Sequence, residues 1–168
     1  MKILRLLLLL FLTTLFAHGQ KFHFRADGGT DFIIYTAGRT PAKNLYNRSV
    51  AWVQTNYPDG NNAFRARAPY SMIRISGKMT DAITIKAGSG KSFAYDATYF
   101  LEFHYKNGKY RAKYFHHAFV VNGQRPLFKL ADIVSPNADA KNVQYKKQYE
   151  AKIQKLLDSH QRFLSKPR

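Results

Sequence analysis

The fold is decided by the stretch at residues 92–121, which reads SFAYDATYFLEFHYKNGKYRAKYFHHAFVV. Apolar and polar side chains alternate along both halves of this stretch, which predicts two half-buried strands at 92–106 and 109–121. Asn107-Gly108 separates the halves, and this dipeptide favours a two-residue hairpin turn because both turn positions require positive φ. The sequence therefore predicts an antiparallel hairpin that pairs residue by residue outward from the turn.

The two faces of this hairpin differ in chemistry, because successive side chains of a strand point to opposite faces. One face is aromatic and aliphatic and is predicted to face the core: Tyr99, Leu101, Phe103, Tyr105, Tyr110, Ala112, Tyr114 and His116. The other face is polar and mostly cationic: Phe100, Glu102, His104, Lys106, Lys109, Arg111, Lys113, Phe115 and His117. On this second face Glu102 lies opposite Lys113 as a favourable cross-strand pair, and we expect the face to be wet.

Further short strands are expected at residues 30–35, 63–68, 71–77 and 80–87. Aromatic and β-branched residues mark the first of them. Breaks at Ala68-Pro69 and Gly77-Lys78 separate the other three. These strands and the hairpin predict one antiparallel sheet.

Two helices are expected from hydrophobic periodicity. The first begins at Thr40-Pro41, because a hydroxyl N-cap followed by proline favours a helix start. Its inward face comprises Leu45, Tyr46, Ser49, Trp52 and Val53. Ser135-Pro136 repeats the signal and predicts a long helix to about Leu164. Its inward stripe comprises Tyr149, Ile153, Leu156, Leu157, His160 and Phe163.

This order of elements predicts a two-layer α+β domain, in which two helices cover one face of an antiparallel sheet and leave the other uncovered. The chain has 168 residues, of which 45% are hydrophobic and 22% charged, a composition typical of a globular protein. It contains no cysteine, which excludes a disulfide scaffold, a thiolate zinc site and a cysteine nucleophile.

The N-terminus predicts export. Residues 1–5 form a short basic region with Lys2 and Arg5, Leu6–Ala17 is mostly apolar, and Ala17-His18-Gly19 offers small residues for cleavage before Gln20. The apolar run is shorter than the roughly 20 residues that a spanning helix needs, which favours a cleaved signal over an anchor. Cleavage would remove two basic residues and no acid, lowering the formal net charge from +17 to +15. We expect residues 20–168 to form one domain, in the periplasm or outside the cell, without a membrane span.

Several motifs are similar to those of one known family. They are Gly19-Gln20, Leu45-Tyr46, Ala51-Trp52, Tyr57, Met72–Gly77, Tyr95–Tyr99 and Lys106–Arg111. On these motifs the chain resembles a bacterial secreted family described as domain of unknown function 4468, with a TBP-like fold. The resemblance spans roughly residues 30–120, with a compatible C-terminal helix. It implies β-α-β(4–5)-α topology on a curved antiparallel sheet, and it implies no catalytic residue.

Two candidate ligand motifs do not fit their chemistry. Gly88–Ser92 lacks the first glycine of a phosphate-binding loop and joins two antiparallel strands instead of opening a helix. His116 and His117 are adjacent in a strand and point to opposite faces, so they cannot readily join His104 around one metal ion. The sequence therefore predicts no cofactor and no metal.

Asp96 interrupts an otherwise aromatic strand and is the acid that stands out. We expect it to be structural, paired with a base on a neighbouring strand such as Arg65, Arg67 or Arg74. The alternative is a catalytic role, which perturbed carboxyls in clefts often have.

The charge bears most directly on partners, because 27 Lys and Arg residues against 10 Asp and Glu residues attract polyanions. The candidate surface for a polyanion or partner comprises Phe100, His104, Lys106, Lys109, Arg111, Lys113 and Phe115. We expect positive charge to collect on this uncovered face, although a merely solvated basic surface would have the same composition.

Three functions are compatible with these features. The first is a non-enzymatic envelope or extracellular module that binds a partner protein or an anionic polymer. The second is an enzyme acting on envelope glycans or lipids, with Asp96 and the hairpin histidines near its site. The third is binding of extracellular nucleic acid, by analogy with TATA-box recognition on a concave sheet; this rests on fold alone, and export argues against a genomic partner.

Overall fold

The computed structural model describes residues 20–86, 90, 92–121 and 128–166. The predicted signal segment at 1–19 and most of the glycine-rich loop lie outside the described residues. In the part that is described, no helix is long and apolar enough to cross a membrane.

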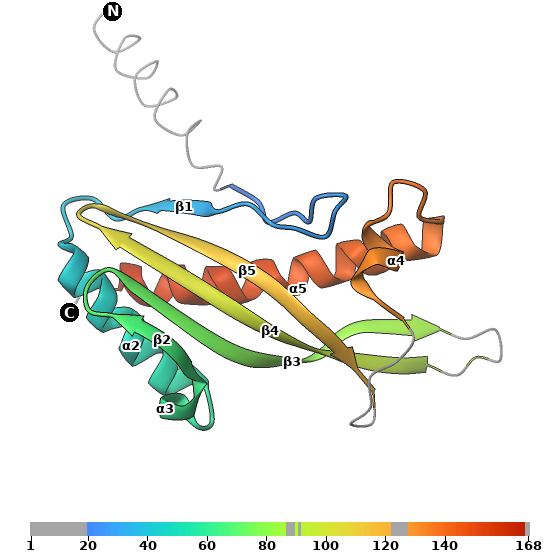
Figure 1. Cartoon of the computed structure of the whole chain (residues 1–168), viewed down its shortest axis with the longest axis horizontal. Coiled ribbons are helices and arrows are strands. Elements are labelled where there is room, and N and C mark those ends of the chain that lie inside the picture. The colour runs from blue at the N-terminus through green and yellow to red at the C-terminus, as the bar shows by residue number, and fades with distance from the viewer. Residues whose placement is uncertain (1–19, 87–89, 91, 122–127, 167–168) are drawn as a thin grey trace, which may run out of the picture.

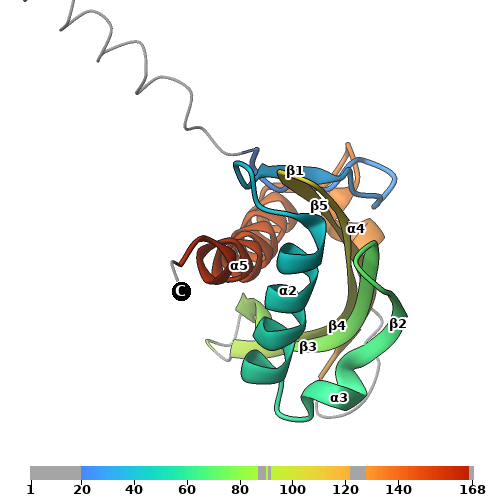
Figure 2. The ribbon, with the colours of Figure 1, turned by 90° about the vertical axis from the view of Figure 1, so that its left-hand side faces the viewer.

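The described residues form a five-stranded antiparallel sheet in the order β1-β5-β4-β3-β2. The elements are β1 (Ile33–Thr36), α2 (Ala42–Asn56), α3 (Gly60–Ala63), β2 (Phe64–Ala68), β3 (Met72–Lys86), β4 (Ser92–Lys106), β5 (Lys109–Val120), α4 (Leu130–Val134) and α5 (Ala140–Ser165) (Figure 1). The sheet curls around α2 and α5, which lie together on its inner side (Figure 2). This is the predicted two-layer α+β architecture.

The core lies between the inner side of the sheet and these two helices. Every residue of the predicted inward face of α2 is buried, and so are Tyr149, Ile153, Leu157 and His160 of α5. The predicted core face of the hairpin is also buried, except that His116 is half-buried. Aromatic rings fill much of the space, and the imidazole of His160 stacks on Phe103 with ring centroids 4.0 Å apart.

The predicted register of the hairpin is confirmed from Lys106–Lys109 back to Tyr99–His116. Beyond that point a bulge shifts the register, so that Thr98 pairs with Ala118. A bulge places one extra residue in one of two paired strands. Here the extra residue is His117 of β5.

The prediction of separate strands at 71–77 and 80–87 is wrong, because both lie in the single strand β3. Gly77 does not break the strand; it pairs with Tyr99. A Cβ atom at this position would lie 2.5 Å from Cζ and Oη of Tyr99, so a glycine is required by close packing. The irregularity occurs further on, between Met79 and Ile83.

Both predicted helix starts are displaced. The N–H at the start of α2, on Ala42, donates to Oδ1 of Asn107 at 2.9 Å, so the hairpin turn caps this helix in place of the Thr40 hydroxyl. Ser135-Pro136 does not open the last helix but follows α4, which the sequence did not predict. The α5 helix begins after Asp139, whose carboxylate accepts a hydrogen bond from the Asn142 N–H at 2.7 Å.

Candidate functional site

The seven predicted residues lie together on the side of the sheet away from α2 and α5. Neighbouring segments add Phe32, which precedes β1, and Arg74 of β3, which was expected to be a partner of Asp96. We call this surface the cation–ring face: Phe32, Arg74, Phe100, Glu102, His104, Lys106, Lys109, Arg111, Lys113 and Phe115. It draws on four segments that are far apart in the sequence.

Cations and aromatic rings alternate across this face. The Arg74 guanidinium lies 4.9 Å from the ring centroid of Phe100 and 5.2 Å from that of Phe115. The Lys113 ammonium lies 5.2 Å from the rings of both Phe115 and Phe32, and the Arg111 guanidinium is 4.1 Å from Phe32. Each contact contributes roughly 0.5–1 kcal/mol at an exposed site. Together they hold three cations in a continuous band from β3 to the start of β1.

Glu102 is the acid of the cation–ring face. It is the cross-strand neighbour of both Arg74 and Lys113, as the predicted register requires for Lys113. Its carboxylate, however, contacts other groups: Oε1 lies 2.6 Å from Nε2 of His104, and Oε2 lies 3.9 Å from Nη1 of Arg74. The expected side-chain pair with Lys113 is therefore replaced by these two contacts, because Lys113 lies over the phenylalanine rings.

Two of the hollows formed by the described residues lie on this side of the sheet. The first has a volume of about 290 Å³ and is lined by Ile34, Ser71, His104, Tyr105, Lys106, Lys109, Tyr110 and Arg111. The second, of about 480 Å³, is lined by Arg65, Ser76, Gly77, Thr98, Tyr99, Phe100 and His117. In it Arg65 donates a hydrogen bond from Nε to the Ser76 hydroxyl at 2.7 Å. Four of the seven predicted residues thus share the first hollow, and Phe100 reaches the second.

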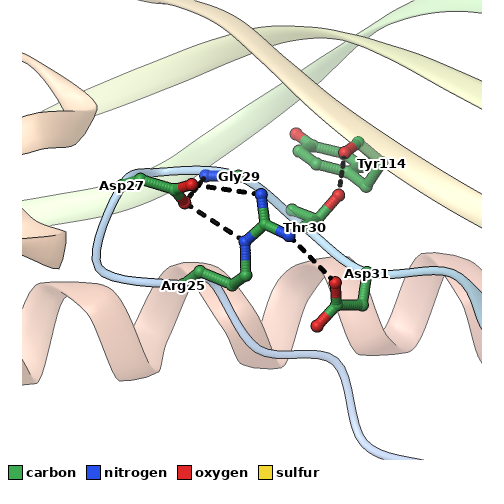
Figure 3. Close-up of polar contacts among 6 residues, drawn as sticks. All are labelled: Arg25, Asp27, Gly29, Thr30, Asp31 and Tyr114. Carbon is green, nitrogen blue, oxygen red and sulfur yellow. Dashed lines mark hydrogen bonds and ion pairs between the residues drawn. The ribbon is translucent and has the colours of Figure 1, made fainter.

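Phe32 is held in place by the segment before β1, whose polar contacts Figure 3 shows. The Arg25 guanidinium contacts the carboxylates of Asp27 and Asp31, each at 3.1 Å. The Thr30 hydroxyl donates to the Tyr114 carbonyl of β5, which fixes the segment against the sheet edge. The sequence does not point to Phe32 as part of this face, because a short segment beside β1 gives no sign of the strand it will approach.

Asp96 has a structural partner, but not one of the three predicted arginines. Its Oδ2 lies 2.7 Å from Nζ of Lys78, and its Oδ1 accepts a hydrogen bond from the Asp81 N–H at 3.0 Å. The hydrogen bond from Lys78 lowers the pKa of Asp96. Asp96 lines neither hollow, and it braces the irregular part of β3.

The hairpin histidines lie on opposite sides of the sheet. Nδ1 of His116 is 2.8 Å from the Tyr149 hydroxyl of α5, and burial lowers the pKa of His116 to about 4. His117 packs against Phe100, and His104 contacts Glu102 on the cation–ring face. Within the described residues, no three His, Asp or Glu side chains gather as they would around a metal ion.

The expectation that positive charge collects on the uncovered face is only half right. The side of α5 that faces solvent carries its own exposed cations: Lys141, Lys147, Lys155 and Arg162. In the described part of the chain, none of these four lies over an aromatic ring. The cation–ring face therefore differs from the solvent side of α5 in that its cations lie over aromatic rings, and not in how many cations it carries.

Comparison with solved structures finds two proteins of similar fold. The chain is similar to a TBP-like protein from Parabacteroides distasonis ATCC 8503, with a TM-score of 0.63 and 10% identity over 82% of this chain and 93% of that one. The chain has a TBP-like fold. It is also similar to a DUF4468 family protein from Bacteroides ovatus ATCC 8483, with a TM-score of 0.61 and 10% identity over 84% of this chain and 89% of that one.

The TBP-like fold agrees with the resemblance found in the sequence motifs. No family model and no curated protein matches the sequence. At 10% identity the two structures show a common fold, and their names state no activity. Function must be inferred from the residues of the cation–ring face.

Proposed function

We propose that the chain is an exported, non-enzymatic module that binds an anionic polymer of the cell envelope or the extracellular space on its cation–ring face. The observation that carries this proposal is the 290 Å³ hollow lined by His104, Lys106, Lys109 and Arg111. It adjoins the band in which phenylalanine rings hold further cations in place. A basic surface with concave features attracts polyanions and concentrates them locally.

Binding is better supported than catalysis. An enzyme of the proposed alternative class would use Asp96, but that carboxylate is paired with Lys78 and lines neither hollow. The analogy with TATA-box recognition has no support either, because α2 and α5 occupy the inner side of the curled sheet (Figure 2). Export rests on the predicted signal at residues 1–19.

The test compares two double variants of equal charge. Lys109→Glu/Lys113→Glu reverses two charges on the cation–ring face, and Lys147→Glu/Lys155→Glu reverses two exposed charges on α5. We expect the first variant to bind immobilised dextran sulfate at least about tenfold more weakly at low salt, because like-charge contacts cost several kcal/mol. The α5 variant should stay close to the unsubstituted chain.

Circular dichroism should show the same fold in both variants. Equal loss of retention in the two would mean that net charge alone drives binding, and it would contradict the proposal. Unchanged retention of the Lys109→Glu/Lys113→Glu variant would remove the cation–ring face from consideration.

A further inference from the structure

We infer, in an assignment that rests on the proposed function, that the ligand of the cation–ring face is an anionic polysaccharide recognised by its charged groups. In this assignment Phe32, Phe100 and Phe115 are positioning residues: they orient the cations and do not stack on the ligand. Three observations carry the inference, namely the free donors of the cations, the occupied faces of the rings and the length of the face.

The cations of the band have N–H hydrogen-bond donors that remain available for a ligand. Three arginines outside the band donate hydrogen bonds to carboxylates, carbonyls or a hydroxyl, namely Arg25, Arg48 and Arg65, whereas Arg67 lies over the ring of Phe64. Arg74, Arg111 and Lys113 instead meet rings, and the 3.9 Å approach of Arg74 to Glu102 is too long for a hydrogen bond. A guanidinium lying over a ring keeps its N–H edge available, and that edge matches a sulfate, phosphate or carboxylate.

The rings, by contrast, are already occupied. Phe115 contacts Arg74 and Lys113, and Phe32 contacts Arg111 and Lys113. Phe32, Phe100 and Phe115 are all half-buried. Single-stranded nucleic acids gain much of their affinity by stacking bases on free aromatic faces. This surface offers charge without such platforms, which favours a ligand that carries anionic groups but no aromatic rings.

The lining and the spacing of the two hollows favour a ligand made of several linked sugars. The first hollow combines the exposed apolar side chain of Ile34 with the polar groups of Ser71 and His104, as a sugar ring with apolar and hydroxyl-bearing sides requires. The second hollow begins at Phe100. Phe100 and His104 are about 13 Å apart along β4 at roughly 3.3 Å per residue. A ligand that reaches both hollows is longer than one sugar.

The test titrates the chain with three probes: a heparin-derived sulfated hexasaccharide, the corresponding disaccharide, and a single-stranded oligonucleotide with the charge of the hexasaccharide. We expect the hexasaccharide to bind more tightly than either of the others. Phe115→Leu and Phe32→Leu should each weaken hexasaccharide binding about three- to fivefold, because they remove cation–π contacts. Phe115→Tyr should restore it, since tyrosine provides the same ring.

Salt dependence separates positioning from simple loss of structure. The Phe→Leu variants keep every charge, so the slope of log affinity against log salt should stay unchanged while the affinity falls. Arg74→Lys keeps the charge but not the planar group, and we expect a comparable loss. Thermal unfolding followed by circular dichroism verifies that each variant is folded.

The outcomes distinguish this inference from the proposed function. If Lys109→Glu/Lys113→Glu abolishes binding while both Phe→Leu variants bind as before, the polyanion function stands and the positioning role is wrong. Tighter binding of the oligonucleotide, weakened by the same Phe→Leu changes, would show that the rings stack on bases and would overturn the choice of a polysaccharide. If Lys109→Glu/Lys113→Glu also leaves hexasaccharide binding intact, the proposed function itself fails.

Discussion

The two sides of the sheet use aromatic residues in opposite ways. On the side covered by α2 and α5, rings pack against other rings and against the imidazoles of His116 and His160. On the cation–ring face, rings lie beneath arginine and lysine. The difference follows from solvation, because an imidazole can be buried in its neutral form, whereas a permanent cation must stay hydrated or paired. The same alternating strands therefore present a neutral core and a cationic surface.

Acidification should produce the largest effect, and it should act on the covered side. His160 lies 2.8 Å from the Ser49 hydroxyl, which itself donates to the Leu45 carbonyl, so Nε2 of His160 is the donor to Ser49. Burial lowers the pKa of His160 to about 3 and that of His116 to about 4. Because both folded-state values lie below the unfolded value, the unfolded chain binds protons first as the pH falls.

Stability should therefore be constant above about pH 7 and decrease through the window from pH 6.5 toward pH 3–4. At pH 4.5 we expect a loss of about 2–3 kcal/mol per histidine in the free energy of unfolding, measured by urea denaturation. His160→Phe removes one titrating group and should roughly halve the dependence on pH. If this variant has the same pH dependence as the unsubstituted chain, the buried imidazole is not the group that responds.

A substitution at Gly77 should produce the next largest effect. Its added Cβ would lie 2.5 Å from the end of the Tyr99 ring and 2.8 Å from Cε1 of Tyr57. The two tyrosine hydroxyls are 2.8 Å apart and hydrogen-bonded to each other, which limits how far Tyr99 can move. We expect Gly77→Val to lower the free energy of unfolding by about 2–3 kcal/mol through overpacking.

Ser76→Ala is the matched control, because Ser76 directly precedes Gly77 and faces the opposite side of the sheet. It removes the hydrogen bond from Arg65 and should cost about 1 kcal/mol or less. Similar losses in both variants would mean that the two sides of β3 are packed alike, and this would contradict the difference between the covered side and the cation–ring face.

Features that depend on local periodicity are well predicted by the sequence. The hairpin register follows from the Asn107-Gly108 turn and the alternation beside it, and the inward face of α2 follows from its helical spacing. Features that depend on which strands become neighbours are not encoded locally. Phe32 reaches Arg111 only because β1 pairs with β5, although they are far apart in the chain.

In the candidate site, too, the local features are predicted by the sequence and the contacts between distant strands are not. Its seven predicted residues share one side because they belong to one hairpin. Arg74 was expected to be a partner of Asp96, yet it lies opposite Glu102, and Lys78 contacts Asp96 instead. The irregularity between Met79 and Ile83 joins two apparent strands into one, and short-range sequence signals do not distinguish such a bulge from a turn.

The smallest expected effect concerns the acid within the cation–ring face. The Glu102 carboxylate lies between the cross-strand positions of Arg74 and Lys113, so an anionic ligand spanning the band must approach it. Glu102→Gln removes this negative charge and retains an oxygen that can accept from His104. We expect hexasaccharide affinity to rise about two- to threefold at low salt and the gain to vanish at high salt, where surface charges are screened.

Asp158→Asn on α5 changes the net charge equally and should leave this affinity nearly unchanged. The direction of the Glu102→Gln effect decides what organises the face. A gain in affinity means that the rings hold the cations and that Glu102 competes with the ligand for them. Weaker binding would mean that the carboxylate positions Arg74 and His104. The cation–ring face would then resemble the covered side in depending on internal polar partners, and the contrast between the two sides would be reduced.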